Sequence, residues 1–178
     1  MNKTVFSILL ATFLVGATTI FCFADDGGQA YILISSGPAS SRLSFGQNLA
    51  ATDLNDGFYD VPPLLSGQLQ AIFTNGGGEL WRDIRAAGTE TSREWRLRVT
   101  SAAGETIKVS WNQGLLPKNT EVALIDVGTG KAIDMKVLSS YTMENSNGGE
   151  LLIQVSNIHR DANTGLLLLY ETDGTAVL

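Results

Sequence analysis

Cysteine and histidine are almost absent from this 178-residue chain, which contains one of each, Cys22 and His159. Structural zinc and haem sites take most of their protein ligands from these two residue types, so we expect neither kind of site. One cysteine cannot form an intramolecular disulfide. The fold must therefore be held together by packing and hydrogen bonding.

Long apolar runs are also scarce, and the one that exists lies at the N-terminus. Lys3 precedes an apolar stretch, and the small residues Cys22 and Ala24 stand just before the acidic Asp25. This order is typical of a secretory signal peptide. We expect residues 1–24 to be removed. A membrane anchor and a lipoprotein acylated at Cys22 are the alternatives.

Positive charge is in short supply. Twelve Lys and Arg residues face 18 Asp and Glu residues, for a net charge of −6 that becomes −7 once Lys3 is removed. An acidic chain is repelled by nucleic acids and by anionic membrane surfaces, so we expect neither as a partner. After residue 24 no apolar run is long enough to span a bilayer.

Helical periodicity is nearly absent, and short alternating segments take its place. Residues 93–100 and 107–111 each alternate apolar with polar side chains, which is typical of half-buried strands. The short turn at 101–104 predicts that these two strands form a hairpin. Their inward side chains should share one core: Trp95, Leu97, Val99, Ile107, Val109 and Trp111.

About ten such strands predict an all-β fold, an antiparallel β-sandwich that is immunoglobulin-like or jelly-roll-like. Residues 121–127 and 132–137 should form a hairpin, because a glycine-bearing turn joins them. Leu80–Ala87 fits either a helical turn or an edge strand. The other strands are expected at residues 30–35, 42–45, 68–74, 150–156, 165–171 and 175–178.

We expect residues 25–178 to form a single β-sandwich domain. Residues 25–66 would supply N-terminal strands and a crossing connection, and residues 67–178 the main sandwich. The segment 46–67 breaks the strand rhythm and contains Pro62 and Pro63, which cannot donate to a sheet ladder. It is therefore interpreted as a crossing connection between the two sheets, or as a boundary between a short N-terminal piece and the main sandwich.

A family resemblance is carried by the segments Leu43–Gly46, Ala51–Asp53, Phe58–Pro63, Leu80–Arg85, Trp95–Val99, Val109–Trp111, Pro117, Leu124–Asp126 and Ile133–Met135. In these segments the chain is similar to secreted bacterial immunoglobulin-like modules, in the style of the FlgD-like modules of exported proteins. This resemblance implies a binding or structural accessory and not a reaction. The signal peptide predicts that it acts in the periplasm or outside the cell.

The stretch ATDLNDGFYD at residues 51–60 concentrates oxygen donors: Asp53, Asn55, Asp56 and Asp60. Calcium binds six to eight oxygens, so these four side chains suggest a calcium loop. Asp and Asn are also favoured in turns, because their side chains bond to nearby backbone amides. The pattern is not that of an EF-hand. We expect a polar connection between strands, with no cofactor.

Arginine and tryptophan are interleaved between residues 81 and 98. Such a set can bind nucleic acid or an acidic glycan through charge and stacking. The acidic balance of the chain argues against nucleic acid, so the expected partner is a protein or glycan of the envelope or extracellular matrix. Alternatively, Arg96 and Arg98 lie on a solvated strand face and pair with acids on neighbouring strands. The partner-binding candidates are Trp81, Arg82, Arg85, Arg96 and Arg98.

Catalytic signals are weak. His159 lies in a segment that reads as a loop, and no serine sits in a Gly-x-Ser-x-Gly elbow. We therefore expect an exported non-enzymatic binding or structural module, with no catalytic residue. One alternative is a carbohydrate-binding module that stacks sugars on exposed Trp81, Tyr59 or Tyr141. A secreted hydrolase that uses an unidentified pair of carboxylates is the second.

Signal-peptide cleavage after Ala24 predicts that the mature protein begins at Asp25. Intact mass and N-terminal sequencing of the protein recovered from its own cells will check this. Recovery of a chain that still begins at Met1, or that carries a lipid on Cys22, would contradict it.

Overall fold

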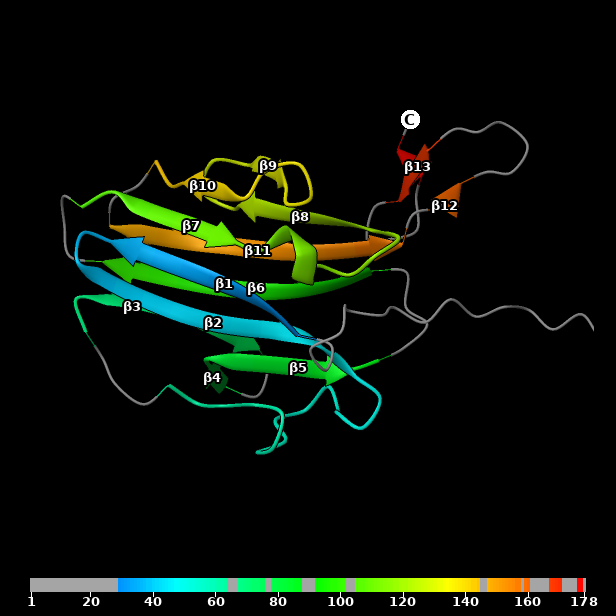
Figure 1. Cartoon of the computed structure of the whole chain (residues 1–178), viewed down its shortest axis with the longest axis horizontal. Coiled ribbons are helices and arrows are strands. Elements are labelled where there is room, and N and C mark those ends of the chain that lie inside the picture. The colour runs from blue at the N-terminus through cyan, green and yellow to red at the C-terminus, as the bar shows by residue number, and fades with distance from the viewer. Residues whose placement is uncertain are drawn as a thin grey trace, which may run out of the picture.

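The computed structural model describes residues 29–63, 67–75, 78–87, 92–101, 105–144, 147–157, 159–160, 167–170 and 176–177. Two β-sheets pack face to face (Figure 1), so the expected all-β sandwich is confirmed. Neighbouring strands are antiparallel except β2 and β5, which run parallel. No helix within these ranges has the length and apolar character needed to cross a bilayer.

The first sheet has the order β10-β7-β1-β2-β5 and the second the order β4-β3-β6-β11-β8-β9. The first sheet contains β1 (Gln29–Ser36), β2 (Ala39–Asn48), β5 (Arg82–Ala86), β7 (Ile107–Trp111) and β10 (Ser140–Thr142). The second contains β3 (Leu69–Asn75), β4 (Gly78–Leu80), β6 (Ser92–Ser101), β8 (Thr120–Asp126), β9 (Lys131–Asp134) and β11 (Gly148–Asn157). A 3-10 turn, η1 (Gln113–Leu115), follows β7, and a third sheet contains β12 (His159–Arg160), β13 (Leu167–Tyr170) and β14 (Ala176–Val177).

The core lies between the two large sheets, and the six side chains that the alternation predicts are all buried in it. Phe45 of β2 packs against Trp95 of β6, with ring centroids 5.3 Å apart. Phe45 also meets Phe73 of β3 edge-on at 6.3 Å. Aromatic rings from opposite sheets thus fill the centre of the sandwich.

The predicted hairpin between residues 93–100 and 107–111 is wrong. The first segment is β6, which pairs with β3 and β11, whereas the second is β7 in the opposite sheet. An alternating pattern shows which side chains share a face of a strand. It does not show which sheet the strand joins, because both sheets direct their apolar faces into the same core.

Other connections follow the sequence. β8 and β9 pair as the predicted hairpin, and β13 pairs with β14. Leu80–Ala87 contains the edge strand β5 and no helical turn. β2, which precedes the segment 49–68, belongs to the first sheet, and β3, which follows it, belongs to the second.

Trp111 gives a test of the packing. Its side chain is buried against the core, and its indole Nε1 donates a hydrogen bond to the carbonyl of Met135 at 2.7 Å. Replacing Trp111 by Ala should lower the free energy of unfolding by about 3–5 kcal/mol, as expected for a buried large aromatic. Urea unfolding measures the loss. The exposed Leu138 is the control, since Leu138→Ala should change it by about 0.5 kcal/mol or less. Equal effects would contradict the packing.

Candidate functional site

The segment that follows β2 lies along the outer edge of β5. β5 is the last strand of the first sheet and has a neighbouring strand, β2, on one side only. In Figure 1 the segment runs below β4 and β5. We call residues 51–61 the edge-capping loop, because its acceptors bind the backbone of β5.

The backbone N–H groups of alternate β5 residues point away from β2. That of Arg82 donates to the carbonyl of Val61 at 3.3 Å, and Trp81 donates to the same carbonyl at 2.6 Å. The N–H of Ile84 donates to Oδ1 of Asp60 at 3.1 Å. An edge strand normally presents such donors unpaired. Here acceptors of the loop bind the N–H groups that a neighbouring strand would otherwise bind.

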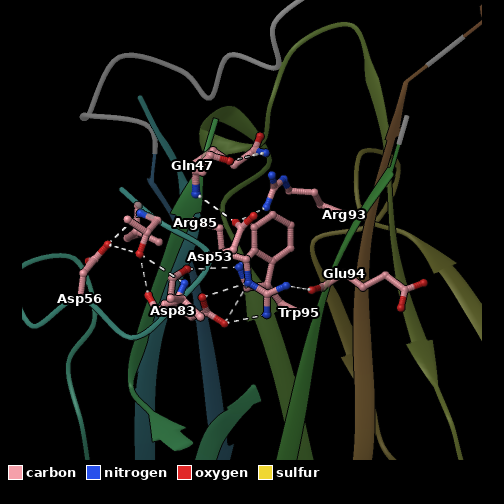
Figure 2. Close-up of polar contacts among 12 residues, drawn as sticks. Gln47, Asp53, Asp56, Asp83, Arg85, Arg93, Glu94 and Trp95 are labelled. Carbon is pink, nitrogen blue, oxygen red and sulfur yellow. Dashed lines mark hydrogen bonds and ion pairs between the residues drawn. The ribbon is translucent and has the colours of Figure 1, made fainter. Parts of the chain in front are cut away.

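The third outward donor meets Asp53. The N–H of Ala86 donates to Oδ1 of Asp53 at 3.2 Å, and Nη1 of Arg93 donates to the same oxygen at 2.5 Å. The Arg93 side chain is only 6% exposed. Because one carboxylate oxygen receives both a β5 amide and a buried guanidinium, Asp53 joins the loop to both sheets (Figure 2).

The loop is braced internally by its other acids. Oδ2 of Asp56 accepts from the N–H of Thr52 at 2.8 Å and from its hydroxyl at 3.0 Å. Oδ1 of Asp56 accepts from the N–H of Tyr59 at 3.2 Å. Oδ2 of Asp60 accepts from the N–H of Asp56 at 3.0 Å. These bonds close two successive tight turns, as Asp side chains commonly do.

Arg82 adds a second attachment from β5 to the loop. Its Nε donates to the carbonyl of Tyr59 at 2.9 Å, and its Nη2 donates to the carbonyl of Phe58 at 2.6 Å. Carbonyls in a tight turn have few partners nearby, and a charged donor binds them more strongly than a neutral one. Arg82 thus fixes the second turn against the sheet.

Asp83, Arg85 and Trp95 form a polar contact between the sheets next to this edge (Figure 2). Nη2 of Arg85 lies 2.9 Å from Oδ2 of Asp83, and its Nη1 donates to the carbonyl of Glu94 at 2.6 Å. The indole of Trp95 donates to the Asp83 carbonyl at 3.2 Å. The Arg85 guanidinium also lies 5.4 Å from the Trp95 ring centroid. β5 is thereby tied to β6 across the sandwich.

Burial raises the pKa of the Asp60 carboxyl, and the hydrogen bonds from the Asp56 and Ile84 amides oppose this rise. The negative charges of Asp83 and Asp56 add smaller upward contributions. Asp60 is only 2% exposed. A desolvated carboxylate is costly even where backbone donors surround it, so the Asp60 carboxyl binds a proton more readily than an exposed aspartate does.

The four candidate calcium ligands do not share one centre. Asp56 and Asp60 are brought together by a hydrogen bond, whereas Asp53 turns to Arg93 and β5, and Asn55 is exposed. The carboxylates of Asp53, Asp56 and Asp60 instead accept hydrogen bonds from N–H groups of the protein itself. Within the described residues, no group of three or more acidic, His or Cys side chains is arranged to hold a metal ion. The geometry favours the polar-connection interpretation.

The partner-binding candidates fall into two groups. Arg96 and Arg98 are exposed on β6 and form ion pairs with Glu150 of β11 and Glu79 of β4. Arg96 thus pairs with an acid on the neighbouring strand β11, as the sequence-based alternative expects, whereas the partner of Arg98 lies on β4, which β3 separates from β6. Arg82 and Arg85 instead bind the loop and Asp83, and Trp81 beside them is half-buried.

The aromatic candidates for sugar stacking are mostly covered. Tyr141 is buried, and its hydroxyl donates to Oδ2 of Asp126 at 2.8 Å, so it is not part of an exposed platform. Tyr59 and Trp81 are half-buried. The exposed ring at this edge belongs to Phe58, which the sequence reasoning did not single out.

Sequence reasoning also missed Arg93 and Asp83. The alternation that places Trp95, Leu97 and Val99 inside extends back to Arg93, so its inward direction was readable from the sequence. Asp83 has no comparable signal, because β5 is short and its partner strand is parallel and distant in the chain.

His159 lies in strand β12 and not in a loop, so that expectation is wrong. Its side chain is outside the described residues, as are residues 1–24 with Cys22. Comparison with known proteins gives no match to a family model, a curated protein or a solved structure. The geometry of the edge-capping loop is therefore the basis for the function proposed below.

Asp60 gives a test of the loop. Asp60→Asn removes one acceptor, so at neutral pH the variant should lose about 1–3 kcal/mol of stability. Because the folded pKa lies above the unfolded value of 3.8, the native state binds more protons between the two. The Asp60 contribution therefore grows as pH falls through the folded pKa and levels off below the unfolded one.

The stability difference between wild type and Asp60→Asn should accordingly widen from pH 7 to pH 4. Urea unfolding of both proteins across this pH range measures the difference. The other carboxylates are the same in both proteins, so their effects on stability cancel to first order. A difference that stays constant or narrows toward acid would contradict the placement of Asp60.

Proposed function

We propose that the protein is an exported, non-enzymatic binding module of the bacterial envelope or extracellular space, and that the edge-capping loop is its contact surface. The observation that carries this proposal is the pair Leu54 and Phe58. Their side chains are 78% and 79% exposed, although both are large and apolar. Burial against a partner would stabilise both side chains, as on the apolar patches of interaction sites.

The loop presents these two side chains on a fixed backbone. Leu54 lies in the turn that Thr52 and Asp56 close, and Phe58 lies in the turn that Asp56 and Tyr59 close. The Phe58 ring meets the Tyr59 ring edge-on at 5.0 Å. A surface ordered before binding loses less conformational entropy when a partner docks, which favours affinity.

Charge indicates the kind of partner. The edge-capping loop carries three aspartates and no Lys or Arg, and the whole chain has a net charge of −6. Complementary potentials steer association and exclude wrong partners. The surface therefore fits a protein with an apolar cleft and a basic rim better than an anionic membrane or a nucleic acid.

Location and origin rest on the sequence. The signal-peptide pattern of residues 1–24 supports export to the periplasm or the medium. The resemblance to secreted immunoglobulin-like modules of the FlgD-like kind supports a binding or structural accessory. The two least exposed acids, Asp60 and Asp83, bind protein donors, so neither supports the hydrolase alternative.

Carbohydrate binding is the second candidate, because Phe58 and the half-buried Tyr59 and Trp81 belong to one region. The carbonyl of Val61 accepts from the N–H of Trp81, and that of Tyr59 accepts from Arg82. Rings grouped in this way can stack on the apolar face of a sugar.

Affinity capture from the native cell envelope and medium tests the proposal. The double variant Leu54→Ser/Phe58→Ser should lose the partner, since truncating a central apolar anchor costs about 2 kcal/mol, roughly thirtyfold in Kd. Val137→Ser/Leu138→Ser is the matched control, because these side chains are 72% and 52% exposed elsewhere. Equal capture by both variants would contradict the proposal. Glycan binding that depends on Phe58 would support the second candidate.

A further inference from the structure

Among the described residues, β5 is the longest of the four strands at the outer edges of the two large sheets. It has five residues, whereas β4 and β10 have three and β9 has four. An exposed edge strand can pair with a strand of another molecule, and a very short edge reduces that risk. The edge-capping loop therefore covers β5, the longest of these four edge strands.

Three donors define how another strand would bind. The N–H groups of Arg82, Ile84 and Ala86 point outward and are bound by the loop. In an antiparallel pair, facing residues of the hydrogen-bonded type exchange both of their backbone bonds. A strand centred opposite Ile84 would use all three donors and the carbonyls of the same residues.

The side chains of β5 are complementary to a second copy of β5 in that register. When Ile84 faces Ile84 of the second copy, Asp83 faces Arg85 and Arg85 faces Asp83. Arg82 then faces Ala86, so no like charges meet. Opposite charges directly across an antiparallel pair are stabilising. The arrangement has the two-fold symmetry that most protein dimers use.

We infer that β5 is a self-pairing edge, and that the edge-capping loop prevents a second copy of this chain from adding to the sheet there. The acceptors of Val61, Asp60 and Asp53 hold the donors that the second strand would bind. This inference is independent of the proposed function, because it depends on the backbone contacts of the loop and not on Leu54 or Phe58.

Sedimentation equilibrium over a concentration series tests the inference. Wild type should remain a monomer. Asp53→Ala/Asp60→Ala removes two of the three caps and should shift the average mass toward that of a dimer as concentration rises. Adding Ala86→Pro removes one donor from the uncapped edge. Proline is tolerated where an edge N–H faces away from the ladder, so this triple variant should return to a monomer.

Asp126→Ala is the matched control. Asp126 is also buried and accepts hydrogen bonds from Gly128, Thr129 and Tyr141, and it lies on β8 of the second sheet, whereas β5 belongs to the first. The Asp126→Ala variant should stay monomeric, because destabilising the fold elsewhere leaves the loop acceptors on β5 in place. Dimerisation of this control, or a folded and monomeric Asp53→Ala/Asp60→Ala variant, would overturn the inference.

If the double variant does not fold, the single variant Asp53→Ala is used in its place, because it keeps the hydrogen bond from the Ile84 N–H to Asp60. It should show weaker association, which Ala86→Pro abolishes. A folded Asp53→Ala variant that is as monomeric as wild type would overturn the inference.

Discussion

The hydrogen-bonding requirement of one edge strand organises this end of the protein. β5 pairs with β2 on one side, and three of its backbone donors face the other way. Backbone donors are rarely left unpaired in folded proteins. The connection from β2 to β3 supplies the acceptors. Its aspartates bind the sheet and close its turns, and its large apolar side chains Leu54 and Phe58 are exposed.

Buried charge is the energetic cost of this arrangement. Asp60 and Asp83 are almost fully buried, and Arg93 brings a guanidinium to the same region. Taking ions out of water is unfavourable, and pairing or hydrogen bonding recovers only part of that loss. Apolar packing holds the centre of the sandwich, whereas directional polar contacts fix this end. Such contacts define one position for the loop.

The features that the sequence predicts depend on residues close together in the chain, whereas those that it does not predict depend on residues far apart. Alternation within β6 and β7 predicts the six core side chains, because the period of two is a local property. It does not predict their separation into two sheets. β4 and β10 have three residues each, too few for a period to be visible. The bond between Asp53 and Ala86 joins residues 33 positions apart, and no local pattern encodes it. Asp and Asn between residues 53 and 60 indicated a polar connection but not its partner.

Amide hydrogen exchange measured by NMR tests most directly whether loop carboxylates cap β5. In wild type the amides of Ile84 and Ala86 should be protected, as amides within a paired strand are. In Asp53→Ala the amide of Ala86 should exchange much faster, while that of Leu97 in β6 stays unchanged. Wild-type amides of Ile84 and Ala86 that exchange as fast as those of exposed turns, with β6 still protected, would contradict the account.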